Sequence, residues 1–350
     1  MRRRPLSTEG ADLSSRRDKE DRATDSTRHV FGPVASGRLG LSLGLDLLGA
    51  RICTFDCLYC EAGVTEALTT ARKPYVPARR ILGELADWKA AGHGLPDAVT
   101  LGGLGEPCLN TDCGEIIAGA RELFPNVPVA VLTNSSLLSD PDVRSALSGA
   151  DIVLPSMDTL VAAEYQRLNR PHQTLGLDAI RQGLLDFRGG FAGSIFLEIL
   201  LVAGQNDSAE NLGLLREFCR ELAPTRVDVV TLSRPGAYPG AKAVAGDVLA
   251  RFREALGAAR PGPWAPSGDG HGPAGLLGDG AARAPRDPGL TDADLAARIA
   301  ASVARRPQTA AGLATALGQP APRIQSALDA LLRTGAVRRE RSGQDIFYSG

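Results

Sequence analysis

The chain of 350 residues has no long hydrophobic run, and no stretch approaches the roughly 20 apolar residues that a membrane-spanning helix needs. Basic residues follow Met1, but no apolar segment comes after them, so the N-terminus does not match a secretory signal. An excess of charge is also missing, with 39 basic against 40 acidic residues, so nothing draws the whole chain to nucleic acid or membrane. We therefore expect a cytoplasmic protein whose cysteines stay reduced and free to bind a metal.

Cysteine is scarce, yet half of the six cysteines lie within eight residues, as Cys53, Cys57 and Cys60. Thiolates spaced three to four residues apart on one loop can converge on a soft metal centre. A structural zinc site needs a fourth ligand, but the nearest downstream histidine is His93. An odd number of clustered thiols does not suit a disulfide framework either. The pattern predicts a cubic iron–sulfur cluster in which one iron has no protein ligand and can chelate a small molecule.

The motif C-x3-C-x2-C, with Tyr59 directly before the third cysteine, resembles that of the radical S-adenosylmethionine (radical SAM) superfamily. The resemblance implies that Cys53, Cys57 and Cys60 hold a 4Fe–4S cluster and that the free iron binds S-adenosylmethionine. It also implies an external electron donor of the flavodoxin or ferredoxin type, and cleavage of the cofactor to a 5′-deoxyadenosyl radical. By the same resemblance, Tyr59 is expected to pack near the adenine.

A glycine-rich segment follows a short buried strand predicted at 98–101. It reads Gly-Gly-Leu-Gly-Glu-Pro and resembles the Gly-Gly-Glu-Pro motif of the same superfamily, although Leu104 and Gly105 stand between the glycine pair and Glu106. Versions reading Gly-x-Gly-Glu-Pro occur in a related group, so the match begins at Gly103. The resemblance implies that Gly103, Gly105 and Glu106 bind the amino end of S-adenosylmethionine, since a carboxylate at a strand end suits an ammonium.

The segment before the cysteines resembles the lead-in of an uncharacterised radical SAM group related to the tRNA-wybutosine (4-demethylwyosine) synthases. The shared phrase is Phe-Gly-Pro-Val at 31–34, followed by Arg38, a Ser-Leu-Gly step and Asp46. Arg38 and Asp46 either line the site or form a surface ion pair. An Asn-Arg-Pro phrase begins at Asn169, and Arg170 within it is a candidate for binding an anionic substrate.

Short apolar strands alternate with amphipathic helices of about ten residues over most of the chain, which predicts parallel β/α units. Six units resemble the partial (β/α)6 TIM-like barrel of radical SAM enzymes. Sites in β/α barrels lie at the carboxyl ends of the strands, where several polar residues fall. Asn134, Ser156 and Asp158 are candidates for binding the ribose and carboxylate of S-adenosylmethionine, or alternatively cap the following helices. Glu198, inside an apolar strand, is expected to point into the barrel.

Composition divides the chain into four parts. Residues 1–28 are polar and charged, which predicts a disordered tail. The radical SAM partial barrel is predicted at 29–257, and the Gly, Pro and Ala-rich stretch 258–290 predicts a flexible linker. Cys108, Cys113 and Cys219 are expected to be plain buried thiols of the barrel.

Residues 291–350 predict three helices, the first capped by Thr291, and a β-hairpin, an order that resembles a winged helix. The third helix is only mildly basic on its outer side, and the hairpin adds Arg338, Arg339 and Arg341. Nucleic-acid binding and docking to a protein or to the barrel remain equally compatible with this pattern.

Together these features predict a radical SAM enzyme. An RNA base, a peptide side chain and a small metabolite all remain as substrates. The alternative is an iron–sulfur redox sensor that regulates nucleic-acid binding through the winged helix, although a sensor needs no glycine-rich cofactor cradle.

Overall fold

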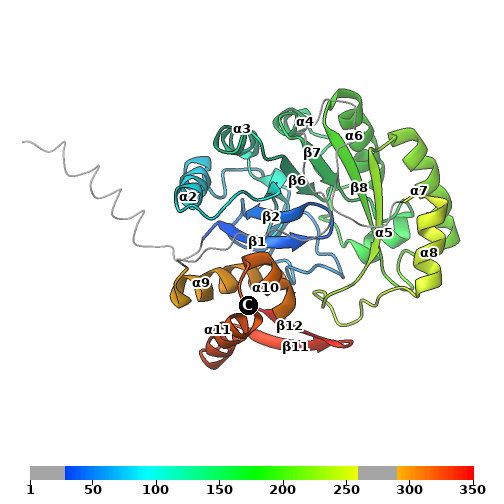
Figure 1. The fold of residues 1–350 in the computed structure, drawn as a ribbon. Helices are drawn as coiled ribbons and strands as arrows, with labels where there is room; N and C mark the ends of the chain where they lie inside the picture. The colour runs from blue at the N-terminus through cyan, green and yellow to red at the C-terminus, as the bar shows by residue number, and fades with distance from the viewer. Residues whose placement is uncertain (1–27, 259–289) are drawn as a thin grey trace, which may run out of the picture.

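A computed structural model describes residues 28–258 and 290–350 of the chain (Figure 1). The tail predicted at 1–28 and the linker predicted at 258–290 thus lie outside the described residues, except for their end positions. Within the described ranges, no helix is both long and apolar enough to cross a membrane.

One curled sheet of seven strands organises the larger part of the molecule, in the order β1-β2-β5-β6-β7-β8-β9. β1 and β2 are antiparallel, and the six strands from β2 onward are parallel. The predicted α/β half-barrel is therefore confirmed, whereas β1 was not predicted as a strand. The strands are β1 (Val30–Ser36), β2 (Gly40–Leu45), β5 (Ala98–Leu101), β6 (Val129–Thr133), β7 (Ile152–Pro155), β8 (Ser194–Leu201) and β9 (Arg226–Thr231).

Helices cover the convex face of this sheet (Figure 1). Each presents an apolar stripe, such as Ile81 and Leu85 on the first helix, which are completely buried. The strands are nearly continuous apolar runs because both of their faces are buried, as along β5 and β7. The helices are α2 (Ala78–Ala90), α3 (Cys113–Leu123), α4 (Pro141–Leu147), α5 (Ala162–Leu168), α6 (Leu177–Gly190), α7 (Ala209–Leu222) and α8 (Gly246–Ala255), with a 3-10 turn η1 (Pro107–Leu109).

The concave face carries a small separate apolar cluster, which includes Ala130, Ile152 and Phe196. Side chains alternate between the faces of a strand, so Glu198 lies on the same concave face as Phe196. Asp228 is the register partner of Glu198 on β9 and is completely buried. The interior of the half-barrel is therefore apolar at one end and charged further along.

Residues 290–350 form a second compact part, called here the C-terminal unit, with its own hydrophobic cluster. Thr291 caps the first helix, as predicted, by accepting a hydrogen bond from the backbone N–H of Asp294 at 3.1 Å. The short strand β10 was not predicted. The elements are α9 (Asp292–Val303), β10 (Gln308–Thr309), α10 (Ala310–Leu317), α11 (Ala321–Arg333), β11 (Arg338–Ser342) and β12 (Asp345–Ser349), and the sheet order is β10-β12-β11.

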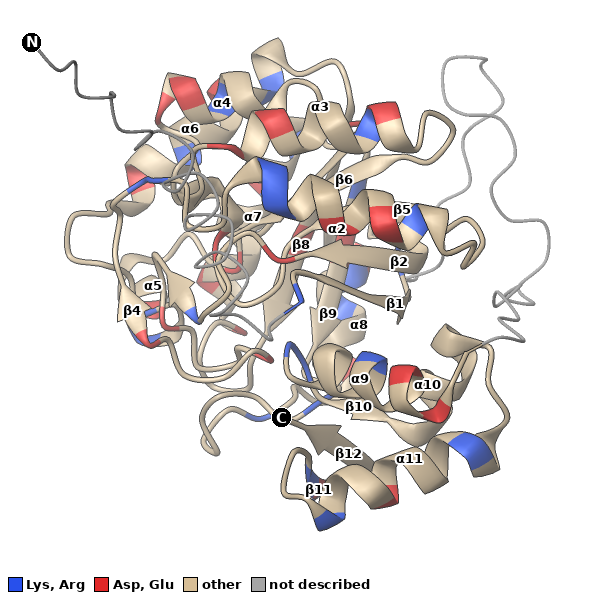
Figure 2. Ribbon diagram, turned by 90° about the vertical axis from the view of Figure 1, so that its left-hand side faces the viewer, with Lys and Arg blue, Asp and Glu red and all other residues tan. Residues whose placement is uncertain are grey.

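The C-terminal unit packs against β1 through α9 and α10, while α11 and the hairpin lie on the side away from the barrel (Figures 1 and 2). A buried ion pair joins the two parts, because the Arg305 guanidinium lies 3.1 Å from the carboxylate of Asp46. The Arg305 guanidinium also lies over the ring of Phe31 at 4.7 Å from its centroid. The C-terminal unit is thus attached to the start of the barrel sheet.

Candidate functional site

The three cysteines lie on the loop after the carboxyl end of β2. Cys53 belongs to the two-residue strand β3 (Ile52–Cys53), which pairs with β4 (Ala67–Leu68), and Cys57 and Cys60 form a turn in which the backbone N–H of Cys60 donates to the carbonyl of Cys57 at 3.2 Å. Burial raises the pKa of Cys53 to about 12, and Glu106 and Cys60 add to the effect. Burial, Cys60 and Cys53 likewise raise the pKa of Cys57. The three thiols therefore lie near one another on a half-buried loop.

This donor set fits a cluster better than a single ion. The described residues contain no group of three or more His, Cys, Asp or Glu side chains arranged to hold one metal ion. A 4Fe–4S cluster takes its thiolates at separate irons, so its ligands need not converge on one atom. Bound iron would also remove the mutual repulsion that disfavours the thiolates here.

Amide groups from two other loops donate to the cysteine sulfurs. The Asn134 side-chain amide, after β6, lies 3.5 Å from the Cys53 Sγ and donates to the Thr54 hydroxyl at 2.8 Å. The Asn169 amide, at the end of α5, lies 3.6 Å from the Cys57 Sγ. Hydrogen bonds to the sulfurs are one means by which a protein sets the potential of a cluster. The sequence analysis missed the role of Asn169, although the Asn-Arg-Pro phrase marked its position.

The glycine-rich loop after β5 is docked directly beneath Cys53. A Cβ on Gly105 would lie 1.8 Å from the carbonyl oxygen of Ile52, so only glycine fits at this position. The backbone N–H of Glu106 donates to that same carbonyl at 3.3 Å. The structure thus brings the two predicted motifs together. Gly103 faces elsewhere, because a Cβ there would meet the Cβ of Asp46 at 3.0 Å.

The carboxylate of Glu106 is buried and accepts three hydrogen bonds from the chain itself. The donors are the backbone N–H of Cys108 at 3.1 Å, the Thr133 hydroxyl at 2.8 Å and the backbone N–H of Asn134 at 2.7 Å. Burial raises the pKa of Glu106, and these hydrogen bonds oppose the rise. The carboxylate therefore ties the glycine-rich loop to the end of β6 and has few lone pairs left for the predicted ammonium partner.

The variant Gly105→Ala should disrupt this docking. Its methyl group would overlap the Ile52 carbonyl, so the loop must move away from Cys53, at an expected cost of about 1–3 kcal/mol in the free energy of unfolding. Gly102→Ala is the matched control, because its Cβ would make only ordinary contact with Leu132 at 3.6 Å. Urea denaturation measures the free energy of unfolding of both variants. Equal values would contradict the close approach of Gly105 to the Ile52 carbonyl.

The variant Glu106→Gln should destabilise the site although it preserves shape. An amide NH2 would replace one acceptor oxygen and face a donor, which leaves buried polar groups unsatisfied and costs about 1–3 kcal/mol. Glu115→Gln, on the exposed side of α3, should stay within about 0.5 kcal/mol of wild type. Thermal or chemical denaturation measures the stability of the two variants. A Glu106→Gln variant as stable as wild type would show that the Glu106 carboxylate does not hold the glycine-rich loop to the end of β6.

Four of the predicted cofactor residues line one pocket between the cysteine loop and β7. They are Tyr59, Asn134, Ser156 and Asp158. Tyr165 also lines this pocket, and its buried hydroxyl has no hydrogen-bond partner among the described residues. An unsatisfied buried hydroxyl is the kind of group that a bound ligand would complete.

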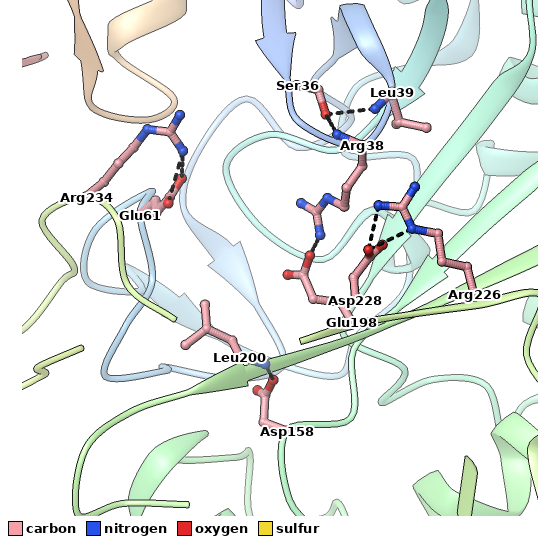
Figure 3. A network of polar contacts seen from close by, with 10 residues as sticks. All are labelled: Ser36, Arg38, Leu39, Glu61, Asp158, Glu198, Leu200, Arg226, Asp228 and Arg234. Atoms are coloured by element: carbon pink, nitrogen blue, oxygen red, sulfur yellow. Dashed lines mark hydrogen bonds and ion pairs between the residues drawn. The ribbon is translucent and has the colours of Figure 1, made fainter. Parts of the chain in front are cut away.

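The Asp158 carboxylate is taken up by hydrogen bonds from the chain itself. It accepts hydrogen bonds from the Tyr59 hydroxyl and from the Asn169 amide at 3.1 Å. It also accepts one from the backbone N–H of Leu200 at 2.9 Å (Figure 3). The helix-cap alternative for Asp158 is wrong, because α5 begins after Val161 without a side-chain cap. Asp158 therefore positions Tyr59 and Asn169 beside the cysteines.

Charged pairs occupy the remaining part of the concave face (Figure 3). Arg38, from the turn between β1 and β2, pairs with Glu198, and Arg234, after β9, lies 3.3 Å from Glu61. The surface ion-pair alternative for Arg38 and Asp46 is wrong, because Arg38 reaches Glu198 in the interior and Asp46 is held by Arg305.

Arg170, the predicted anion-binding residue, is engaged with its own surroundings. It lies 3.0 Å from the Asp56 carboxylate and over the Tyr238 ring. Of the three cysteines expected to be buried, Cys108 and Cys113 are buried and Cys219 is only half-buried.

A comparison with family models matches residues 47–212 to the radical SAM superfamily. A UPF0026 protein of Synechocystis sp. is 37% identical over 210 residues, which cover 59% of this chain and 76% of that protein. A UPF0026 protein of Methanocaldococcus jannaschii is 31% identical and covers 65% of this chain and 72% of that protein.

A protein of Brachyspira hyodysenteriae named GTPase Obg is 34% identical over 218 residues, but the chain spans only 32% of its length. Among solved structures, a radical SAM methyltransferase from Sphaerobacter thermophilus has a TM-score of 0.46 at 17% identity, over 61% of this chain and 62% of that one. Streptococcus suis SuiB bound to S-adenosylmethionine has a TM-score of 0.44 at 18% identity, and the match covers 73% of this chain and 51% of that one.

Proposed function

Because this chain belongs to the UPF0026 family and contains a radical SAM domain, we propose that it is an enzyme that cleaves S-adenosylmethionine reductively to modify a further substrate. The observation that carries the proposal is the docking of the glycine-rich loop against Ile52, directly beside Cys53. A sensor has no need of this second motif, so the packing favours the enzyme over the redox-sensor alternative.

In this proposal Cys53, Cys57 and Cys60 hold the 4Fe–4S cluster. A cluster held by these thiolates would supply one electron, taken from an external donor of the flavodoxin or ferredoxin type, for the reductive cleavage of S-adenosylmethionine. The amides of Asn134 and Asn169 orient and polarise the cysteine sulfurs. The chain's share of the chemistry is thus to hold three thiolates and to keep water out of a buried site.

The cofactor is expected beside the cysteine loop, where Tyr59 and Ser156 line a pocket of about 20 Å³ that must widen to admit it. Asp158 holds the Tyr59 ring in place through the phenol hydroxyl. Gly105 lets the backbone approach the cysteine loop closely, and Glu106 fixes that backbone. We assign Glu106 and Asp158 mainly to positioning, in place of the direct cofactor contacts that the motif alone suggested.

We further propose that the described barrel residues within 29–257 and the C-terminal unit are separate domains and that the latter is winged-helix-like. The order of three helices and a hairpin supports this assignment. Its third helix is poorly disposed to bind a phosphate backbone, because Arg323 is paired with Asp292. The packing of α9 and α10 on β1 instead favours docking to the barrel. An RNA base, a peptide side chain and a small metabolite all remain as substrates.

The test is anaerobic reconstitution followed by addition of dithionite and S-adenosylmethionine. We expect about four irons per chain and formation of 5′-deoxyadenosine. Iron binding without cleavage, together with a redox-dependent shift in nucleic-acid binding, would instead support the sensor.

A further inference from the structure

The half-barrel is open along one side. The sheet begins at β1 and ends at β9, and no strand pairing joins these two among the described residues. The C-terminal unit packs on the β1 side of this opening. Arg306, in the turn after α9, also lies close enough to Arg234, which follows β9, for the two charges to interact. The C-terminal unit therefore reaches across the opening from one border strand toward the other.

Two consecutive arginines after α9 serve different purposes. Arg305 is 3% exposed at its side chain and attaches the unit to Asp46. Arg306 lies close enough to Arg234, Glu61 and Arg38 for their charges to act on it. Its Nε is buried and has no hydrogen-bond partner in the described part of the chain. Burial and the neighbouring arginines lower the pKa of Arg306 to about 10.

The charges around Arg306 do not balance. Each acid nearby already has its own arginine: Arg38 with Glu198, Arg226 with Asp228, and Arg234 with Glu61. Arg306 is the fourth arginine against three acids and has no counter-ion among them. A guanidinium with a buried, unpartnered nitrogen is energetically costly. A planar guanidinium binds carboxylate or phosphate through bidentate hydrogen bonds.

We infer that the C-terminal unit closes the open side of the half-barrel and that Arg38, Arg234 and Arg306 together bind an oxyanion of the substrate, a phosphate or a carboxylate group. These three residues are called the arginine cluster. The inference names the substrate class of the proposed enzyme and therefore rests on that proposal. It uses residues from three separate segments: the β1–β2 turn, the loop after β9 and the turn after α9.

Titration calorimetry of the anaerobically reconstituted full chain tests the inference, with inorganic phosphate and succinate as probes at constant ionic strength set by chloride. We expect one of the two probes to bind saturably, and the preferred probe tells a phosphate-bearing substrate from a carboxylate. Arg306→Gln should weaken that binding about tenfold or more, since a hydrogen bond to a charged group is lost. Arg341→Gln, an exposed arginine on β11, is the matched control and should bind like wild type.

Binding of neither probe above the chloride background, or equal binding by Arg306→Gln and wild type, would overturn the inference. Arg234→Gln provides an independent variant of the same cluster if Arg306→Gln does not fold. Cleavage of S-adenosylmethionine is measured on the same wild-type preparation. Cleavage without anion binding refutes the arginine cluster alone, whereas anion binding without cleavage counts against the proposed function and leaves the cluster standing.

Discussion

Cys57→Ala is expected to abolish both cluster binding and the cleavage of S-adenosylmethionine. Cys57 contributes one of only three thiolates in the site, and its sulfur is the acceptor of the Asn169 amide. Two remaining thiolates cannot hold three irons of a cluster. Iron and sulfide analysis after anaerobic reconstitution, followed by chromatography of 5′-deoxyadenosine after dithionite addition, measures the two losses.

Cys219→Ala is the matched control for this experiment. Cys219 is a half-buried thiol on α7, and its raised pKa of about 11 has burial as its cause, with no other cysteine involved. The control should keep about four irons per chain and wild-type cleavage. Retention of iron and cleavage by Cys57→Ala would remove the cysteine triad from the mechanism.

Arg305→Ala is expected to lower the free energy of unfolding by about 3–5 kcal/mol, because it leaves the buried carboxylate of Asp46 without its counter-charge. Asp46 is 1% exposed at its side chain, so its carboxylate lies away from solvent in the intact protein. The same carboxylate accepts hydrogen bonds from the backbone of Leu48 and Gly49, before the cysteine loop. Urea denaturation measures the loss, and hydrogen exchange should rise in β1 and α9.

The matched control is Arg341→Ala in the same unit. Arg341 is exposed on β11, so its truncation should change the free energy of unfolding by no more than about 0.5 kcal/mol. If both variants lost the same small amount of stability, the pair between Arg305 and Asp46 would not attach the C-terminal unit to the barrel.

The parallel strands were predictable because both of their faces are covered, which makes each a short apolar run between helices. The segment Val227–Val230, for example, stands out as apolar except for Asp228. Strand β1 was missed because Gly32 and Pro33 interrupt its alternation and its register shifts between Phe31 and Val34. Pairing with β2 stabilises it, and that long-range effect is not visible in a local pattern.

The candidate site was likewise predictable only in its local motifs. Motif spacing located the three cysteines and the glycine-rich loop, since each depends on residues close together in the chain. The partners of those residues come from distant segments: Asn169 is 112 positions from Cys57. Glu106 and Asp158 have the expected location, but only the fold reveals that their oxygens are taken up by protein donors.

The position of β1 at the border of the sheet has a consequence for solution behaviour. A border strand offers unpaired backbone groups that can recruit a strand from another molecule. With α9 and α10 packed on β1, such recruitment is hindered. The contact that brings Arg306 to the opening of the barrel thus also hinders the addition of a foreign strand at β1.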